Sequence, residues 1–69
     1  MNTLIEIFRP FAKDRFQMDI EVAKYLSGNI IKRQELLHRL TGNVLPLKEC
    51  TIANVSNNLI YYFSQPQLF

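Results

Sequence analysis

The chain has 69 residues, 48% of them hydrophobic, and eight basic against six acidic residues give it a formal net charge of +2. A lone Cys50 and a lone His38 exclude a disulfide and argue against a zinc site, and the interleaved charges argue against nucleic-acid binding by electrostatics alone. No apolar run reaches the ~18 residues of a membrane span, and no basic signal region opens the chain, so we expect one cytoplasmic domain over residues 1–69.

The N-terminal segment TLIEIFRPFAKDRF predicts a short helix, although Thr3 to Phe8 also alternates as a short strand would. Its apolar side chains recur at helical spacing: Leu4, Phe8 and Phe11. Pro10 lacks a backbone donor and would cost a continuous helix ~3 kcal/mol. We therefore expect either a helix that ends near Arg9 or one that begins at Pro10 and ends near Phe16.

Two nearly identical stretches, LSGN at 26–29 and LTGN at 40–43, follow each other at a distance of fourteen residues. A glycine just past a helix takes the left-handed conformation at low cost, and an asparagine after it can cap the next helix. Each stretch is therefore predicted to end one helix and to permit the start of another. Gly28→Val and Gly42→Val are both expected to cost more than ~1 kcal/mol.

This interpretation predicts a helix over 20–27 with Asp19 as its N-cap, and a second helix over 30–41 between Asn29 and Gly42. The apolar face of the second helix consists of Ile30, Leu36, Leu37 and Leu40. Its opposite, polar face carries Lys32, Glu35 and Arg39. The sequence thus predicts an amphipathic helix whose apolar face turns towards the core.

The last segment predicts a helix with Thr51 as its N-cap. Its apolar stripe follows helical spacing: Ile52, Val55, Leu59 and Tyr62. Three asparagines oppose a helix by roughly 2 kcal/mol together, but burial of the stripe at ~1.5–3 kcal/mol per large side chain outweighs them. A strand over 59–63 is the alternative, and we expect the tail at 65–69 to be loose after Pro66. The fold prediction is a small all-α domain of three to four short helices joined by Gly-Asn turns.

The residues give little support for catalysis. His38 and Cys50 could act as base and nucleophile only if the fold joined them, and no third group is indicated to orient the histidine. Gly28 and Gly42 are the only glycines, so a glycine-rich phosphate loop is absent from the sequence. We expect a protein that is not an enzyme and needs neither cofactor nor metal.

One hypothesis for function is DNA binding. The stretch EVAKYL, with the later Leu45-Pro46, resembles the excisionase-type winged helix-turn-helix. This resemblance implies a DNA-binding regulator with the helix from Ile30 in the major groove. The side chains that would contact bases or phosphates are Asn29, Lys32, Arg33, Gln34 and Arg39. The competing interpretation is structural: Asn29 caps the helix, Arg33 lies along its apolar edge, and the other charges are solvated.

The favoured hypothesis is protein interaction. Large aromatic side chains dominate the energetics of protein interfaces, and this chain has more of them than four short helices need. The residues predicted to contact a partner are Phe8, Phe11, Tyr61, Tyr62 and Phe63. Because a core this small rarely supplies more than about 3–5 kcal/mol, we expect a homodimer or a complex with another protein. The chain is thus predicted to be a small regulator or inhibitor that binds a larger protein or assembly.

Overall fold

The computed structural model describes residues 3–66. Over that range the chain forms four α-helices and two short 3₁₀ helices, and no strand. The elements are α1 (Thr3–Glu6), η1 (Arg9–Phe11), α2 (Arg15–Leu26), α3 (Ile30–Thr41), η2 (Leu47–Glu49) and α4 (Ile52–Ser64). The all-α prediction is confirmed, and residues 59–63 are helix and not strand. The predicted loose tail lies in part outside the described residues, at 67–69.

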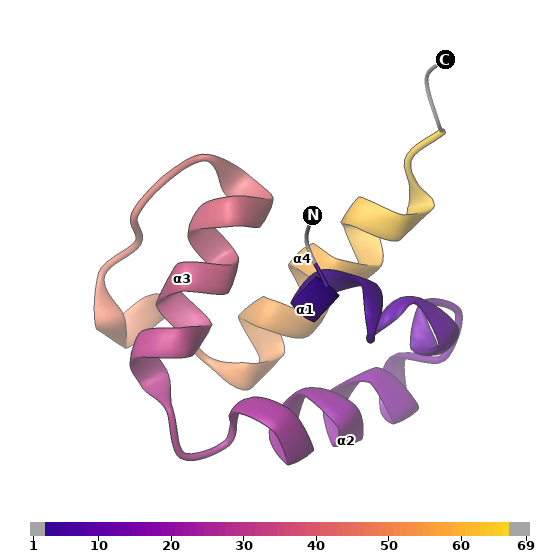
Figure 1. Cartoon of the computed structure of the whole chain (residues 1–69), viewed down its shortest axis with the longest axis horizontal. Helices are drawn as coiled ribbons and strands as arrows, with labels where there is room; N and C mark the ends of the chain where they lie inside the picture. Colours follow the sequence, from indigo (N-terminus) through magenta and orange to yellow (C-terminus); the bar gives the residue numbers. More distant parts are fainter. Residues whose placement is uncertain (1–2, 67–69) are drawn as a thin grey trace.

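Helix α4 organises the fold. It packs against both α2 and α3, whereas α2 and α3 contact each other much less. Figure 1 shows α4 crossing the middle of the molecule, with α2 along the lower edge, α3 at the left and the short α1 in front of α4. The buried core consists of Ile5, Phe8, Met18, Val22, Leu26, Leu36, Leu37, Cys50, Val55 and Leu59. Every α-helix and the segment before α4 therefore contribute to one core.

The N-terminal segment is more broken than the sequence predicted. Helix α1 ends at Glu6, and the chain then turns through a backbone bond from the Phe8 amide to the Ile5 carbonyl at 3.1 Å. Pro10 lies in the first turn of η1, where its missing N–H group is not needed. Both predicted boundaries, a helix ending near Arg9 and a helix from Pro10 to Phe16, are therefore wrong.

Helix α2 begins five residues earlier than predicted. Its N-cap is Asp14, whose carboxylate accepts a hydrogen bond from the backbone N–H of Gln17 at 3.0 Å. The prediction of Asp19 as N-cap is therefore wrong. Both aspartates are good capping residues. The earlier start adds Met18 to the face that carries Val22, and burial of that side chain favours it.

The two Gly-Asn stretches end their helices differently. Gly42 is left-handed, with φ 79°, and its amide donates to the His38 carbonyl at 2.8 Å, as predicted. Gly28 does not have a positive φ, so its predicted left-handed conformation is wrong. At this end of α2 the Arg33 guanidinium donates to two backbone carbonyls, those of Leu26 at 3.1 Å and Ser27 at 2.9 Å. A side chain of α3 therefore pairs with carbonyls that the helix end leaves without an intrahelical partner.

The caps of α3 and α4 agree with the predictions. The Asn29 side-chain oxygen accepts a hydrogen bond from the backbone N–H of Lys32 at 3.0 Å. The Thr51 hydroxyl accepts one from the backbone N–H of Asn54 at 3.0 Å. Tyr62, predicted on the buried stripe of α4, is instead 39% exposed. Among the described residues, no helix combines the length and apolar character needed to cross a membrane.

Candidate functional site

Two of the aromatic side chains predicted to contact a partner belong to the core. Phe8 is 0% exposed and meets Tyr25 edge-to-face, with 5.8 Å between the ring centroids. Phe11 is half-buried and packs against the same core. The broken helix after Glu6 turns Phe8 inward beside Ile5, so its ring is not accessible to a partner in this structure.

The aromatic side chains at the end of α4 are divided between structure and surface. Phe63 is half-buried, meets Tyr62 edge-to-face at 5.1 Å, and has the Arg9 guanidinium 4.7 Å above its ring. Arg9 also makes two 2.8 Å hydrogen bonds to the Glu6 carboxylate. These contacts join the N-terminal segment to the end of α4. Tyr61 stands apart from them and is 65% exposed.

The ion pair in this cluster shifts both pKa values. The hydrogen bonds from Arg9 hold the pKa of the Glu6 carboxyl below its usual value, and Glu6 in turn raises the pKa of Arg9. Both groups are open to solvent, so salt screens the pair and its contribution to stability is small. The cluster therefore links the N-terminal segment to the end of α4 at the surface, and the Arg9 guanidinium is already bonded to Glu6.

The residues predicted to bind nucleic acid do not form one open basic surface. Asn29 caps α3, Arg33 also donates to the Cys50 carbonyl at 2.7 Å, and Gln34 donates to the Leu45 carbonyl at 2.8 Å. Lys32 and Arg39 are exposed on the outer side of α3. The wing that the resemblance to excisionases implies is a pair of strands, and residues 3–66 contain no strand.

The structure does not bring the two candidate catalytic residues together in an open site. Cys50 is buried, and its Sγ lies 3.4 Å from the Pro46 carbonyl oxygen and 3.8 Å from that of Leu45. His38 is exposed in the last turn of α3. Within residues 3–66, no three His, Cys, Asp or Glu side chains come close enough to hold a metal ion.

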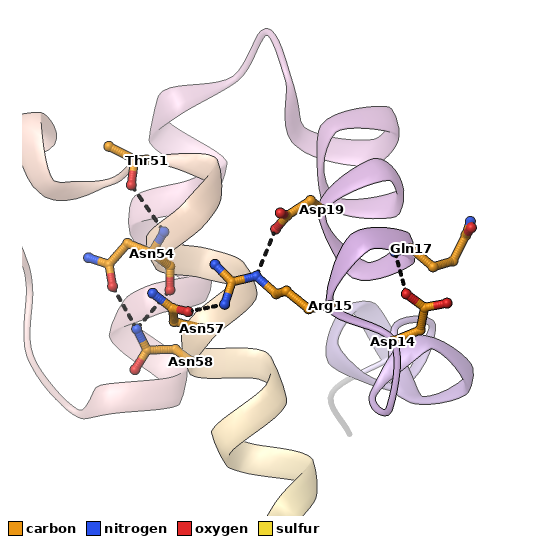
Figure 2. A network of polar contacts seen from close by, with 8 residues as sticks. All are labelled: Asp14, Arg15, Gln17, Asp19, Thr51, Asn54, Asn57 and Asn58. Carbon is orange, nitrogen blue, oxygen red and sulfur yellow. Dashed lines mark hydrogen bonds and ion pairs between the residues drawn. The ribbon is translucent and has the colours of Figure 1, made fainter.

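The most unusual surface of the molecule lies on the outer side of α4, a helix whose thirteen residues include no charge. Asparagines replace the charged residues that normally solvate such a surface. Figure 2 shows two of them joined: the Asn58 side-chain amide donates to the Asn54 backbone carbonyl and to the Asn54 side-chain oxygen, both at 2.9 Å. Asn54 in turn donates to the Glu49 carbonyl at 2.7 Å. These hydrogen bonds orient the side-chain amides of Asn54 and Asn58, which are half-buried.

Helix α2 extends this surface. In Figure 2 the Arg15 side chain reaches across the space between the helices, where it donates to the Asn57 side-chain oxygen and pairs with Asp19 at 3.3 Å. Phe16 is next to Arg15 in the sequence and is 75% exposed, and Ile20, one turn later, is also exposed. We call this surface the α2–α4 face. It consists of Arg15, Phe16, Asp19, Ile20, Asn54, Asn57, Asn58 and Tyr61.

The sequence did contain signals for this face. If Asp14 is taken as the N-cap, Met18 and Val22 form the buried stripe of α2, and Phe16 falls outside that stripe. Phe16 and Ile20 then form an exposed apolar pair one turn apart, and contiguous exposed apolar surface marks a candidate contact site. The asparagines of α4 are a second signal, because asparagine favours caps and turns over helix interiors, and charged residues more often cover the solvent side of a helix.

Comparison with known protein families, with curated proteins and with solved structures finds no match for this chain. The geometry of the α2–α4 face is therefore the basis of the functional argument.

Proposed function

We propose that this chain is a non-catalytic binding protein of the cytoplasm, a small regulator or inhibitor that docks onto a protein partner through the α2–α4 face. The observation that carries the proposal is the exposure of Phe16 on α2 and Tyr61 on α4, two helices that the hydrogen bond from Arg15 to Asn57 joins. Contact between such aromatic surface and water is unfavourable, so a partner that covers this surface lowers the free energy by removing apolar area from solvent.

The composition of the face supports a protein partner. Interface centres are rich in Tyr and Phe and depleted of charged residues, and tyrosine combined with small polar side chains is also typical of antibody binding sites. Two separate sets of hydrogen bonds, from Asn58 to Asn54 and from Arg15 to Asn57, already hold these four polar side chains in place. Binding therefore costs less side-chain entropy than it would for free side chains.

The charge of the face supports a protein over a nucleic acid. Arg15 and Asp19 are its only charged members and cancel each other, whereas affinity for a phosphate backbone comes from an excess of Lys and Arg. On α3, the engagement of Arg33 and Gln34 with backbone carbonyls also weakens the DNA-binding hypothesis. If DNA were the ligand, its affinity would fall steeply with added salt.

The test compares partner capture by a face variant and by a matched control. The face variant combines Phe16→Ser and Tyr61→Ser. The control combines Ile31→Ser and Val44→Ser, which remove apolar side chains that are similarly exposed but lie outside the face. Tagged proteins are used to capture partners from lysate of the cells of origin, and circular dichroism checks that each variant is folded.

We expect one captured protein to be lost with the face variant and retained with the control. The loss should be at least about tenfold in affinity, because truncation of a central aromatic anchor typically costs about 2 kcal/mol or more. Equal capture by both variants would contradict the proposal, and so would a loss that only the control shows.

A further inference from the structure

The α2–α4 face carries one cation and one anion, Arg15 and Asp19, which are 49% and 43% exposed. In a symmetric dimer each surface meets its own copy turned by 180°, so a residue that contacts a second residue is contacted by that residue's copy in return. A surface of one charge sign would repel itself in this arrangement. This face is self-complementary in charge, since Arg15 of one molecule can meet Asp19 of the other twice.

The pair within one helix is weak enough to change partners. Its basic member precedes its acidic member by four residues, which is the poorer orientation for a helical pair. Arg15 is also the first residue of α2, where the positive end of the helix dipole disfavours a cation. Arginine has five N–H donors, so Arg15 can retain its bond to Asn57 and still reach a second carboxylate.

The uncharged members of the face provide apolar surface for the same symmetric dimer. Phe16 and Ile20 lie one turn apart on the exposed side of α2, and Tyr61 lies one turn beyond Asn57 on α4. We infer that the partner of this face is a second copy of the chain, packed about a two-fold axis with Arg15 of each molecule against Asp19 of the other. This inference rests on the proposed function, because it names the partner of the same face.

The test exchanges the two charges. Arg15→Asp gives the face two acids and Asp19→Arg gives it two bases, so each variant repels its own copy while the two variants complement each other. Sedimentation equilibrium of wild type, each variant and their equimolar mixture measures the dimer dissociation constant. One variant carries a mass tag, so that a mixed dimer is distinguished from either homodimer.

We expect the wild type to dimerise and each variant alone to dimerise at least about tenfold more weakly, a change of about 1.4 kcal/mol. The mixture should recover the wild-type dissociation constant as a mixed dimer. The matched control places the same charge reversals on the outer side of α3, as Lys32→Glu and Glu35→Lys, and should leave the constant unchanged. Phe16→Ser weakens the dimer without any change of charge and serves as a second variant should either charge variant fail to fold.

A mixture that dimerises no better than its components would overturn the inference, and so would a wild type that stays monomeric at millimolar concentration. In the second case, if the face still captures a different protein, the second-copy inference fails and the proposed function stands. If the face captures no protein and no dimer forms, both fail together.

Discussion

The two Gly-Asn stretches allow a direct test of the backbone geometry, because nearly identical residues occupy different conformations. Gly42 has φ 79° and ψ 2°, whereas Gly28 has no positive φ. Apart from its own residue and its two chain neighbours, a Cβ atom added at either position would meet no atom of residues 3–66 within 4 Å. A substitution by alanine therefore measures the backbone conformation without a steric contribution.

At Gly42, alanine must adopt the left-handed conformation, which costs roughly 1–2 kcal/mol. At Gly28, alanine restricts the unfolded chain without straining the folded one, which changes stability by about zero or raises it by up to roughly 1 kcal/mol. We thus expect the two variants to differ by about 1–3 kcal/mol, and Gly42→Ala to melt roughly 4–16 °C below wild type. Gly42→Asn is the conservative control and should recover part of the loss, because asparagine tolerates this conformation.

Urea unfolding followed by circular dichroism measures the free energy of each variant. Equal destabilisation at both positions would refute the distinction between the two turns. A silent Gly42→Ala would refute the left-handed cap itself.

Three other substitutions test the hydrogen bonds of Arg33, the buried hydroxyl of Ser56 and the ion pair between Glu6 and Arg9. Arg33→Met should lower the free energy of unfolding by about 2 kcal/mol, because three backbone carbonyls lose a charged donor; Arg33→Lys should rescue little of it, and a full rescue would contradict the role of the guanidinium fork. Ser56→Ala should raise the free energy of unfolding by roughly 1 kcal/mol, since the buried Ser56 hydroxyl has no hydrogen-bond partner within residues 3–66; a loss in urea unfolding would show that the hydroxyl has one. The lowered pKa of Glu6 means that its tie to Arg9 holds fully above the ordinary carboxyl value of 4.5 and is lost as the pH falls through the lowered pKa. An NMR titration should therefore give Glu6 a midpoint below 4.5 that Arg9→Gln raises, and no change with that substitution would contradict the pairing.

The sequence predicts the second half of the fold well because local signals there agree with one another. Asn29 and Gly42 cap the two ends of α3, and Thr51 caps the start of α4. Each of these helices also has an apolar stripe at helical spacing. Short-range capping and periodicity therefore suffice for these two helices.

The first half could not be predicted because its decisive contacts are distant in the sequence or compete locally. Asp14 and Asp19 are equally good caps, and only the packing of Met18 in the core selects the first. Gly28 resembles Gly42 in its local sequence but has no positive φ, and the α2 end beside it is bonded by Arg33, a full helical turn into the next helix.

The candidate site could not be predicted from the sequence either, because it also depends on contacts between distant residues. Phe8 and Phe16 are both aromatic side chains of the first helical segments, and the turn after Glu6 buries one while the cap at Asp14 exposes the other. The link between Arg15 and Asn57 joins residues 42 positions apart, which no periodicity in the sequence could indicate.

The central claim, that the α2–α4 face contacts a protein, is tested most directly by photo-cross-linking from inside the cell. A benzophenone amino acid replaces Tyr61 in one protein and, as the matched control, the similarly exposed Val44 in another. Irradiation should give a covalent protein adduct from position 61 and none from position 44, and the mass of the adduct shows whether the partner is a second copy or another protein. Adducts from position 44 alone, or equally from both positions, would contradict the claim.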